Sequence, residues 1–132
     1  MRPLVSSADL DALLAEPVAL LFKHSDRCPI SGVAHDQIRA LARRRPELPI
    51  WVVDVIDDRS LSQRVAERLH VHHQSPQAIL VVAGAPAWAV SHFQVRLETL
   101  ERRLSALLDA PADEPGERSG ERRGEDRLDA AG

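Results

Sequence analysis

The sequence has few of the features that mark a secreted or membrane-spanning protein. Its 132 residues include one cysteine, so no internal disulfide can form, and a reducing compartment is favoured. No apolar run approaches the roughly 18 residues of a membrane span. The N-terminus also has no continuous apolar segment of the signal-peptide type. We therefore expect a cytoplasmic protein that does not bind membranes.

The sequence also has few aromatic residues and no excess of positive charge. Aromatic residues make up 3% of the chain, so the core must be mostly aliphatic. The net charge of −3 gives no general reason to expect binding to nucleic acid or to an anionic surface. The basic triplet Arg43-Arg44-Arg45 fits the end of a helix, where cations are favoured. We expect no nucleic-acid partner.

The length predicts one folded domain followed by a tail. Residues 1–109 are enough to bury a hydrophobic core. Residues 110–132 are rich in Asp, Glu, Arg, Gly and Pro and have almost no apolar content. Such a composition is typical of disordered segments, so this tail is predicted to be disordered.

Apolar patterning predicts an α/β fold in which helices and strands alternate. A short helix capped by Ser6-Ser7 precedes the apolar strand 18–22, and Asp54 falls near the end of the strand 50–56. Residues 78–82 and 87–90 read as a hairpin around a turn at 83–86. The remaining helices are indicated by apolar stripes, namely Ile30, Val33, Ala34, Ile38, Leu41 and Ala42, then Leu61, Val65 and Leu69, then Leu97, Leu100, Leu104 and Leu107. Helix-length crossovers favour parallel pairing, so we expect a mixed four-stranded sheet flanked by helices.

Cys28 is the predicted nucleophile, because it lies where the first long strand turns into a helix. Backbone N–H groups and the positive end of the helix dipole favour the thiolate there and lower a cysteine pKa. Pro29 suits the first helical position. Lys23, His24 and Arg27 add positive charge, and His24 could support the thiolate as an imidazolium. The alternative is a buried structural cysteine.

Two separated motifs carry a family resemblance. Cys28-Pro29-Ile30-Ser31 has the form C-x-x-S, and His73-Gln74-Ser75-Pro76-Gln77 follows downstream. Together they resemble the monothiol bacilliredoxins, thioredoxin-like proteins of bacillithiol redox metabolism, over about residues 4–108. The predicted order of helices and strands is also that of a thioredoxin-like fold. Arg27 departs from the Thr of the family pattern, which bears on the surface shown to a partner.

The resemblance implies roles for the residues around the cysteine. Pro76 would be a cis-proline facing Cys28, and the alternative is an ordinary loop proline. Ser75, with Pro76 and Gln77, would then bind an extended substrate backbone by strand addition. Ser31 cannot attack a mixed disulfide as a second cysteine would, so an external thiol must resolve Cys28. Ser31 is expected to donate a hydrogen bond to the thiolate.

The predicted function is that of a monothiol thiol-disulfide oxidoreductase. It would remove bacillithiol, or a similar small thiol, from S-thiolated client proteins, with no bound cofactor and no metal. His70, His72 and His73 are interpreted as loop residues and His92 as a cap or surface residue. Two alternatives remain open at this point. One is an iron–sulfur cluster-binding module of the monothiol glutaredoxin type. The other is a non-enzymatic thioredoxin-fold adaptor.

Overall fold

The computed structural model describes residues 1–25, 27 and 29–108. The predicted nucleophile Cys28 and the predicted disordered tail 110–132 lie outside the described residues. Residues Met1–Leu100 form one compact unit. No helix in the described part of the chain is both long and apolar enough to cross a membrane.

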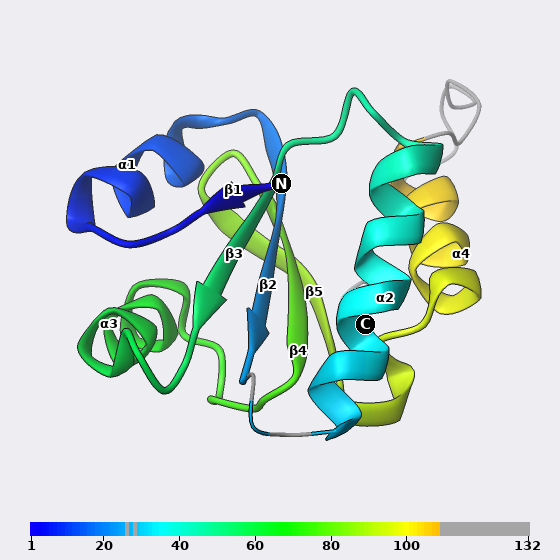
Figure 1. The fold of residues 1–132 in the computed structure, drawn as a ribbon. Helices are drawn as coiled ribbons and strands as arrows, with labels where there is room; N and C mark the ends of the chain where they lie inside the picture. The colour runs from blue at the N-terminus through cyan, green and yellow to red at the C-terminus, as the bar shows by residue number, and fades with distance from the viewer. Residues whose placement is uncertain (26, 28, 109–132) are drawn as a thin grey trace. The chain divides into compact units, whose positions relative to one another are not determined.

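A mixed sheet forms the centre of this unit (Figure 1). Its spatial order is β1-β3-β2-β4-β5. β2 pairs with β3 in parallel and with β4 antiparallel, and β4 pairs antiparallel with β5. The strands are β1 (Arg2–Pro3), β2 (Val18–His24), β3 (Ile50–Asp54), β4 (Gln77–Val82) and β5 (Ala85–Ser91). The predicted mixed sheet is confirmed, but it has five strands, so the expected count of four was wrong.

The strand that the sequence did not reveal is β1, at the edge beside β3. It pairs in parallel with β3, and the next residue, Leu4, donates its N–H to the Val52 carbonyl at 2.7 Å. The Arg2 guanidinium lies 5.2 Å from the centre of the Trp51 ring, a cation–π distance. Two residues that include a proline carry no alternating apolar pattern, so nothing in the sequence marked this strand.

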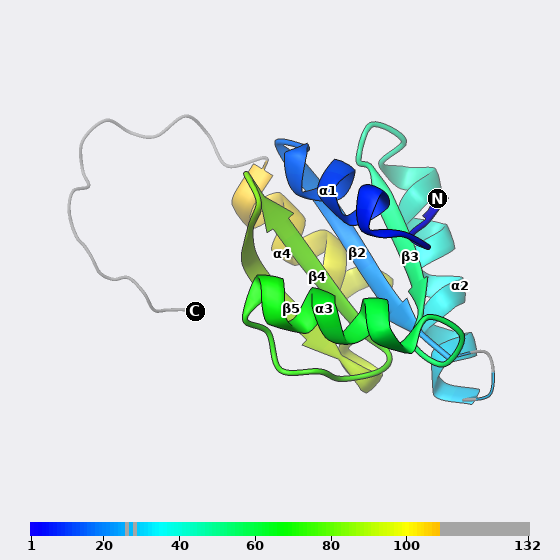
Figure 2. The same cartoon turned by 90° about the vertical axis from the view of Figure 1, so that its left-hand side faces the viewer.

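Helices cover both faces of the sheet. α1 (Ser7–Ala15) and α3 (Arg59–Leu69) lie across one face, as Figure 2 shows, and α2 (Pro29–Arg44) covers the other. The 3₁₀ turn η1 (His92–Gln94) leads from β5 towards α4 (Leu97–Leu108). The Ser6 hydroxyl accepts a hydrogen bond from the Asp9 N–H, which confirms the predicted cap of the first helix.

The central strands β2 and β4 are buried on both faces. Ala19, Leu21 and Ile79 join the core beneath α1 and α3, and Leu61, Val65 and Leu69 of α3 pack there as predicted. Phe22 belongs to the opposite face, where its ring lies 5.6 Å from that of His35 in α2. Successive side chains of a strand point to opposite faces, so Lys23 and His24 continue this alternation beyond Phe22.

α2 buries a narrower stripe than the sequence predicted. Ala34, Ile38 and Leu41 are buried, as expected. Ile30 is only partly buried, however, and Val33 is 64% exposed, while Ser31 is buried. Ser31 lies three residues before Ala34 on the same helix face, so the polar side chain points inward. Ile30 and Val33 therefore belong to an exposed surface.

The turn of the β4–β5 hairpin is shorter than the predicted turn at 83–86. Ala83 and Gly84 alone form the turn, with φ of 52° and 81°. Both central residues of the common two-residue hairpin turn have positive φ. Pro86 lies within β5 opposite Val81, beside an irregularity in register between Leu80 and Val81. A proline is tolerated there because β5 is an edge strand with a bulge.

Candidate active site

Three strands have their termini side by side at one end of the sheet. Lys23 near the end of β2 pairs with Gln77 at the start of β4, and Gln77 pairs in turn with Ser91 at the end of β5. α2 begins at Pro29, the residue after Cys28 in the sequence. The end of β2 therefore lies beside the start of β4, which follows directly on Ser75 and Pro76.

Two serine hydroxyls organise the segment between β2 and α2. Ser31 Oγ accepts a hydrogen bond from the Ser25 N–H at 3.2 Å, and Ser25 Oγ accepts one from the Arg27 N–H at 3.3 Å. Both serines are buried, whereas Arg27 is exposed. Ser31 is thus a structural link across the turn, and the proton of its own O–H group is not used in that link.

His24 occupies a buried position at the end of β2. Its ring stacks on Phe22, with centroids 5.4 Å apart, and lies 5.0 Å from the ring of His35. The ring is therefore part of an aromatic cluster between β2 and α2. Its predicted action on the thiolate stays a prediction, because Cys28 is outside the described residues.

The predicted substrate-binding segment lies beside the end of β5. The Ser75–Pro76 peptide bond is cis, as the resemblance implies. The Pro76 carbonyl accepts a hydrogen bond from the His92 N–H at 2.9 Å. Gln77 is 3% exposed, and its side-chain amide donates to the His72 carbonyl at 3.1 Å while accepting from Lys23. Gln77 therefore holds the preceding loop, and its predicted part in substrate binding stays a prediction.

Lys23 is fully buried, although the sequence predicted a cationic neighbour of the cysteine. Its Nζ lies 2.7 Å from His73 Nδ1 and 3.2 Å from Gln77 Oε1. Burial lowers the pKa of Lys23 from 10.5 to about 8. Partial desolvation also lowers the pKa of His73, and the charges of Lys23 and His72 add to that effect.

The three neighbouring histidines take separate roles. His73 faces Lys23, and His70 ends α3 in a left-handed conformation, with φ of 54°, while its N–H donates to the Ala66 carbonyl. Among the residues that the structure describes, no three His, Cys, Asp or Glu side chains gather as a metal site would require. Asp54 ends β3, as predicted, and its carboxylate accepts from the N–H groups of Ile56 and Asp57.

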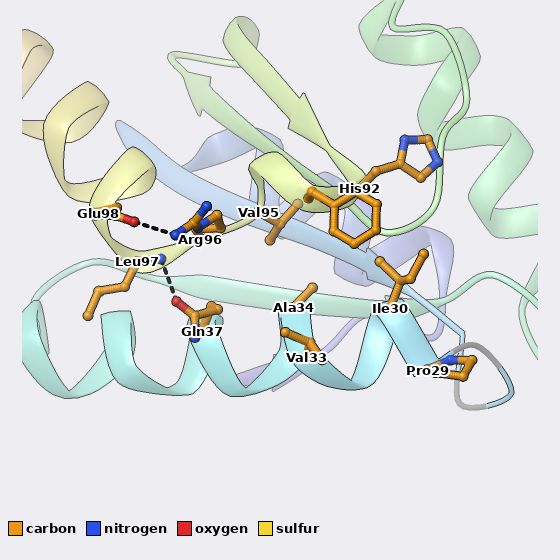
Figure 3. A pocket seen from close by; sticks show the side chains of 11 residues that line it. Pro29, Ile30, Val33, Ala34, Gln37, His92, Val95, Arg96, Leu97 and Glu98 are labelled. Carbon is orange, nitrogen blue, oxygen red and sulfur yellow. Dashed lines mark hydrogen bonds and ion pairs between the residues drawn. The ribbon is translucent and has the colours of Figure 1, made fainter.

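An apolar groove begins at Pro29 and runs along α2 (Figure 3). Its volume is about 680 Å³. Ile30, Val33 and Ala34 form the α2 wall, while residues of η1 and the start of α4 form the other. At the far end, Gln37 Oε1 accepts from the Leu97 N–H at 2.8 Å, and Arg96 pairs with Glu98 at 2.7 Å.

Sequence reasoning missed several residues of this region. Phe93 is 74% exposed and lines the groove, together with His92 and Arg96. An isolated phenylalanine after a strand gives no signal of exposure. The burial of Lys23 could have been found, because Phe22, Lys23 and His24 continue the strand alternation opposite Gln77.

The geometry defines a thioredoxin-fold protein. A solved structure described as a candidate oxidoreductase with a thioredoxin fold is 28% identical, with a TM-score of 0.72, over 76% of this chain and 90% of that chain. The thioredoxin of Fasciola hepatica is 18% identical, with a TM-score of 0.67, over 80% of this chain and 98% of its own. That of Trypanosoma brucei brucei is 13% identical, with a TM-score of 0.70, over 82% and 90%. The predicted thioredoxin-like fold is confirmed.

Within the thioredoxin-fold proteins, a family model identifies the family of this chain. The model described as "Monothiol bacilliredoxin BrxC" matches residues 2–100. The chain belongs to the monothiol bacilliredoxin family, which confirms the resemblance stated from the two motifs. Family and fold together support a thiol oxidoreductase-type function.

Proposed function

We propose that this protein is a monothiol enzyme that removes bacillithiol from mixed disulfides on client proteins. The observation that supports it most directly is the single cysteine, in a C-x-x-S motif, in a chain of the monothiol bacilliredoxin family. The family name supplies bacillithiol, and a similar small thiol would meet the same chemical requirement. A free catalytic thiol needs a reducing compartment, so we place the protein in the cytoplasm.

The reaction takes two thiol–disulfide exchanges. In the first, the Cys28 thiolate attacks the small-thiol sulfur of the mixed disulfide. The client leaves as a thiolate, and a disulfide joins Cys28 to the small thiol. In the second, another small-thiol molecule, as thiolate, attacks the small-thiol sulfur of that adduct. Cys28 leaves as thiolate and a small-thiol disulfide is released, so electrons and bonds balance.

Ser31 has a supporting part in this proposal. Its oxygen is occupied by the Ser25 N–H, so the hydroxyl oxygen is fixed in place. The O–H proton can then be donated to an anion, and a hydrogen bond to a charged group is stronger than one between neutral groups. Pro29 starts α2, whose N-terminal N–H groups favour negative charge.

Client binding would use two surfaces of the described structure. The backbone of Ser75 would pair with an extended client segment, in the manner of strand addition. The apolar groove that starts at Pro29 would receive an apolar side chain of the client, because Val33 and Phe93 are exposed there without covering residues of this chain among those described. Arg27 is exposed and would face the client as well.

The deciding experiment follows a bacillithiolated client protein by intact mass. With wild-type enzyme and no added small thiol, we expect the client to lose bacillithiol and the enzyme to gain it. Cys28→Ser should leave both masses unchanged. Transfer by the Cys28→Ser protein would contradict the proposal.

The two alternatives from the sequence make different predictions in the same preparation. A cluster-binding module would show visible absorbance that requires Cys28, and an adaptor would bind clients equally well as wild type and as Cys28→Ser without any transfer. We expect neither result.

A further inference from the structure

A buried amine sits beneath the loop that leads to Ser75. Lys23 has no exposed surface, and apart from Gln77 its neighbours on the same face of the sheet include the apolar Leu21 and Ile79. Burying an ammonium among apolar groups is costly unless hydrogen bonds compensate it. A methionine would fill the same space without that cost. The hydrogen bonds of the Lys23 amine must therefore offset the cost of burying it.

The hydrogen bonds of the Lys23 amine connect it to the loop of residues 71–74, directly through His73 and indirectly through Gln77. Lys23 Nζ bonds His73 Nδ1 at 2.7 Å and Gln77 Oε1 at 3.2 Å, and the Gln77 amide donates to the His72 carbonyl at 3.1 Å. We call Lys23, His73 and Gln77 the clasp. Residues 71–74 have neither helix nor strand structure, so they lack the ladder bonds that hold a strand in place.

The C-terminal end of the loop is held by backbone hydrogen bonds. The Pro76 carbonyl accepts from the His92 N–H, and β4 begins at Gln77. At the opposite end, the Val71 N–H donates to the Ala66 carbonyl at the end of α3. Between these two anchors, the clasp supplies the hydrogen bonds that connect the loop to the sheet.

We infer that Lys23 is a positioning residue for client binding. Through the clasp it sets the path of residues 72–75, and so the place at which the Ser75 backbone meets an extended client segment. This inference rests on the proposed function for its kinetic consequence. Its structural consequence, an ordered loop, is independent of that function.

The inference predicts a division between two kinetic constants. A client protein engages the Ser75 backbone, so loss of the clasp should raise KM for the client. The chemistry at Cys28 does not involve the clasp, so kcat should change little. A small bacillithiol-containing disulfide has no extended chain to pair, and its turnover should be unaffected.

Lys23→Met and His73→Ala break the clasp from its two ends. We expect each to raise KM for a bacillithiolated client about tenfold, as loss of one charge-assisted hydrogen bond would do. Leu21→Met is the control in the core, and His72→Ala is the control in the loop, since its backbone carbonyl remains. His73 is exposed, so His73→Ala should fold even if Lys23→Met does not.

A second measurement needs no activity. Amide hydrogen exchange at residues 71–75 should speed up in Lys23→Met and His73→Ala and stay unchanged in both controls. By NMR titration, the pKa of His73 should rise in Lys23→Met, because a neighbouring positive charge is gone. If wild type fails to act on the client, the proposed function fails, yet exchange and titration still decide the clasp. Unchanged exchange, or a fall in kcat with unchanged KM, would overturn the inference.

Discussion

The Ser31 hydroxyl accepts the backbone N–H of Ser25 across the turn between β2 and α2. In a dithiol C-x-x-C motif the second cysteine would occupy the place of Ser31 and resolve the mixed disulfide. Here the residue at that place connects the two ends of the turn. The C-x-x-S motif therefore has a structural hydrogen bond at the position where a C-x-x-C motif has its second reactive thiol.

Ser31→Ala should cost stability and retain most turnover. The change leaves the buried Ser25 N–H without its acceptor, a penalty of about 1–3 kcal/mol. Chemical denaturation would measure this, with Ser62→Ala as the control. Ser62 is equally buried, but its hydroxyl has no hydrogen-bond partner among the described residues, so its loss should cost little. If Ser31→Ala were as inactive as Cys28→Ser, another mechanism would be needed.

Cys28 should titrate below the pKa of about 8.5 of an ordinary cysteine. The reason is its place in the sequence directly before α2, whose N-terminal N–H groups favour an anion, together with the charge of Arg27, which precedes it in the sequence. The rate of alkylation as a function of pH would give the midpoint. A midpoint at or above the ordinary value would remove the argument for an activated nucleophile.

The stability of the wild type relative to Lys23→Met should depend on pH. The folded pKa of Lys23 is about 8 and its ordinary value is 10.5, so between these values the unfolded chain binds more protons. The wild type should therefore gain stability relative to the variant as pH rises through this window, and show no such gain below it. Denaturation of both proteins between pH 7 and about 10.5 tests this. A constant difference would contradict the burial of the ammonium.

Val33→Ser should weaken client binding if the groove receives a client side chain. Val33 is 64% exposed, so the change should barely alter stability. The KM for a bacillithiolated client should rise severalfold, while turnover of a small disulfide stays the same. Val5→Ser is the matched control, because Val5 is 60% exposed and does not line the groove. Equal effects of both changes would remove the groove from the proposal.

If the proposed function holds, the protein should release small thiols from clients much faster than it reduces ordinary protein disulfides. Attack on a protein disulfide leaves Cys28 joined to the client, and Ser31 cannot release it. Attack on a client–small-thiol disulfide leaves a compact adduct that a second small thiol can reach. Insulin reduction and bacillithiol release, with the same small thiol present, compare the two. Efficient insulin reduction would contradict a monothiol mechanism.

Much of the fold could be predicted from the sequence because local signals and burial agree. The Ser6 cap, the apolar strand at 18–22 and the Leu61, Val65 and Leu69 face each carry a clear pattern. The family followed from two motifs at the ends of different elements. The strand β1 escaped, because its pairing is decided by the position of β3 and by no pattern of its own.

The site was harder to predict where a residue has a partner far away in the sequence. The motif suggested a substrate role for Gln77 but gave no sign that its side-chain amide accepts from Lys23 and donates to the His72 carbonyl. Val33 was placed in the core stripe by its spacing, and the structure exposes it. The Lys23 partner of Gln77 lies 54 residues away along the chain, and the residues that face Val33 across the groove belong to η1 and the start of α4.

The two outer strands of the sheet each contain a proline, Pro3 in β1 and Pro86 in β5. Proline supplies no N–H to a further strand, and the register irregularity beside Pro86 interrupts the even spacing that a new strand would need. Stacking of copies edge to edge is thereby discouraged. The edges of the sheet are thus poor sites for pairing with a further strand, so the backbone proposed to pair with an extended client lies elsewhere, at Ser75.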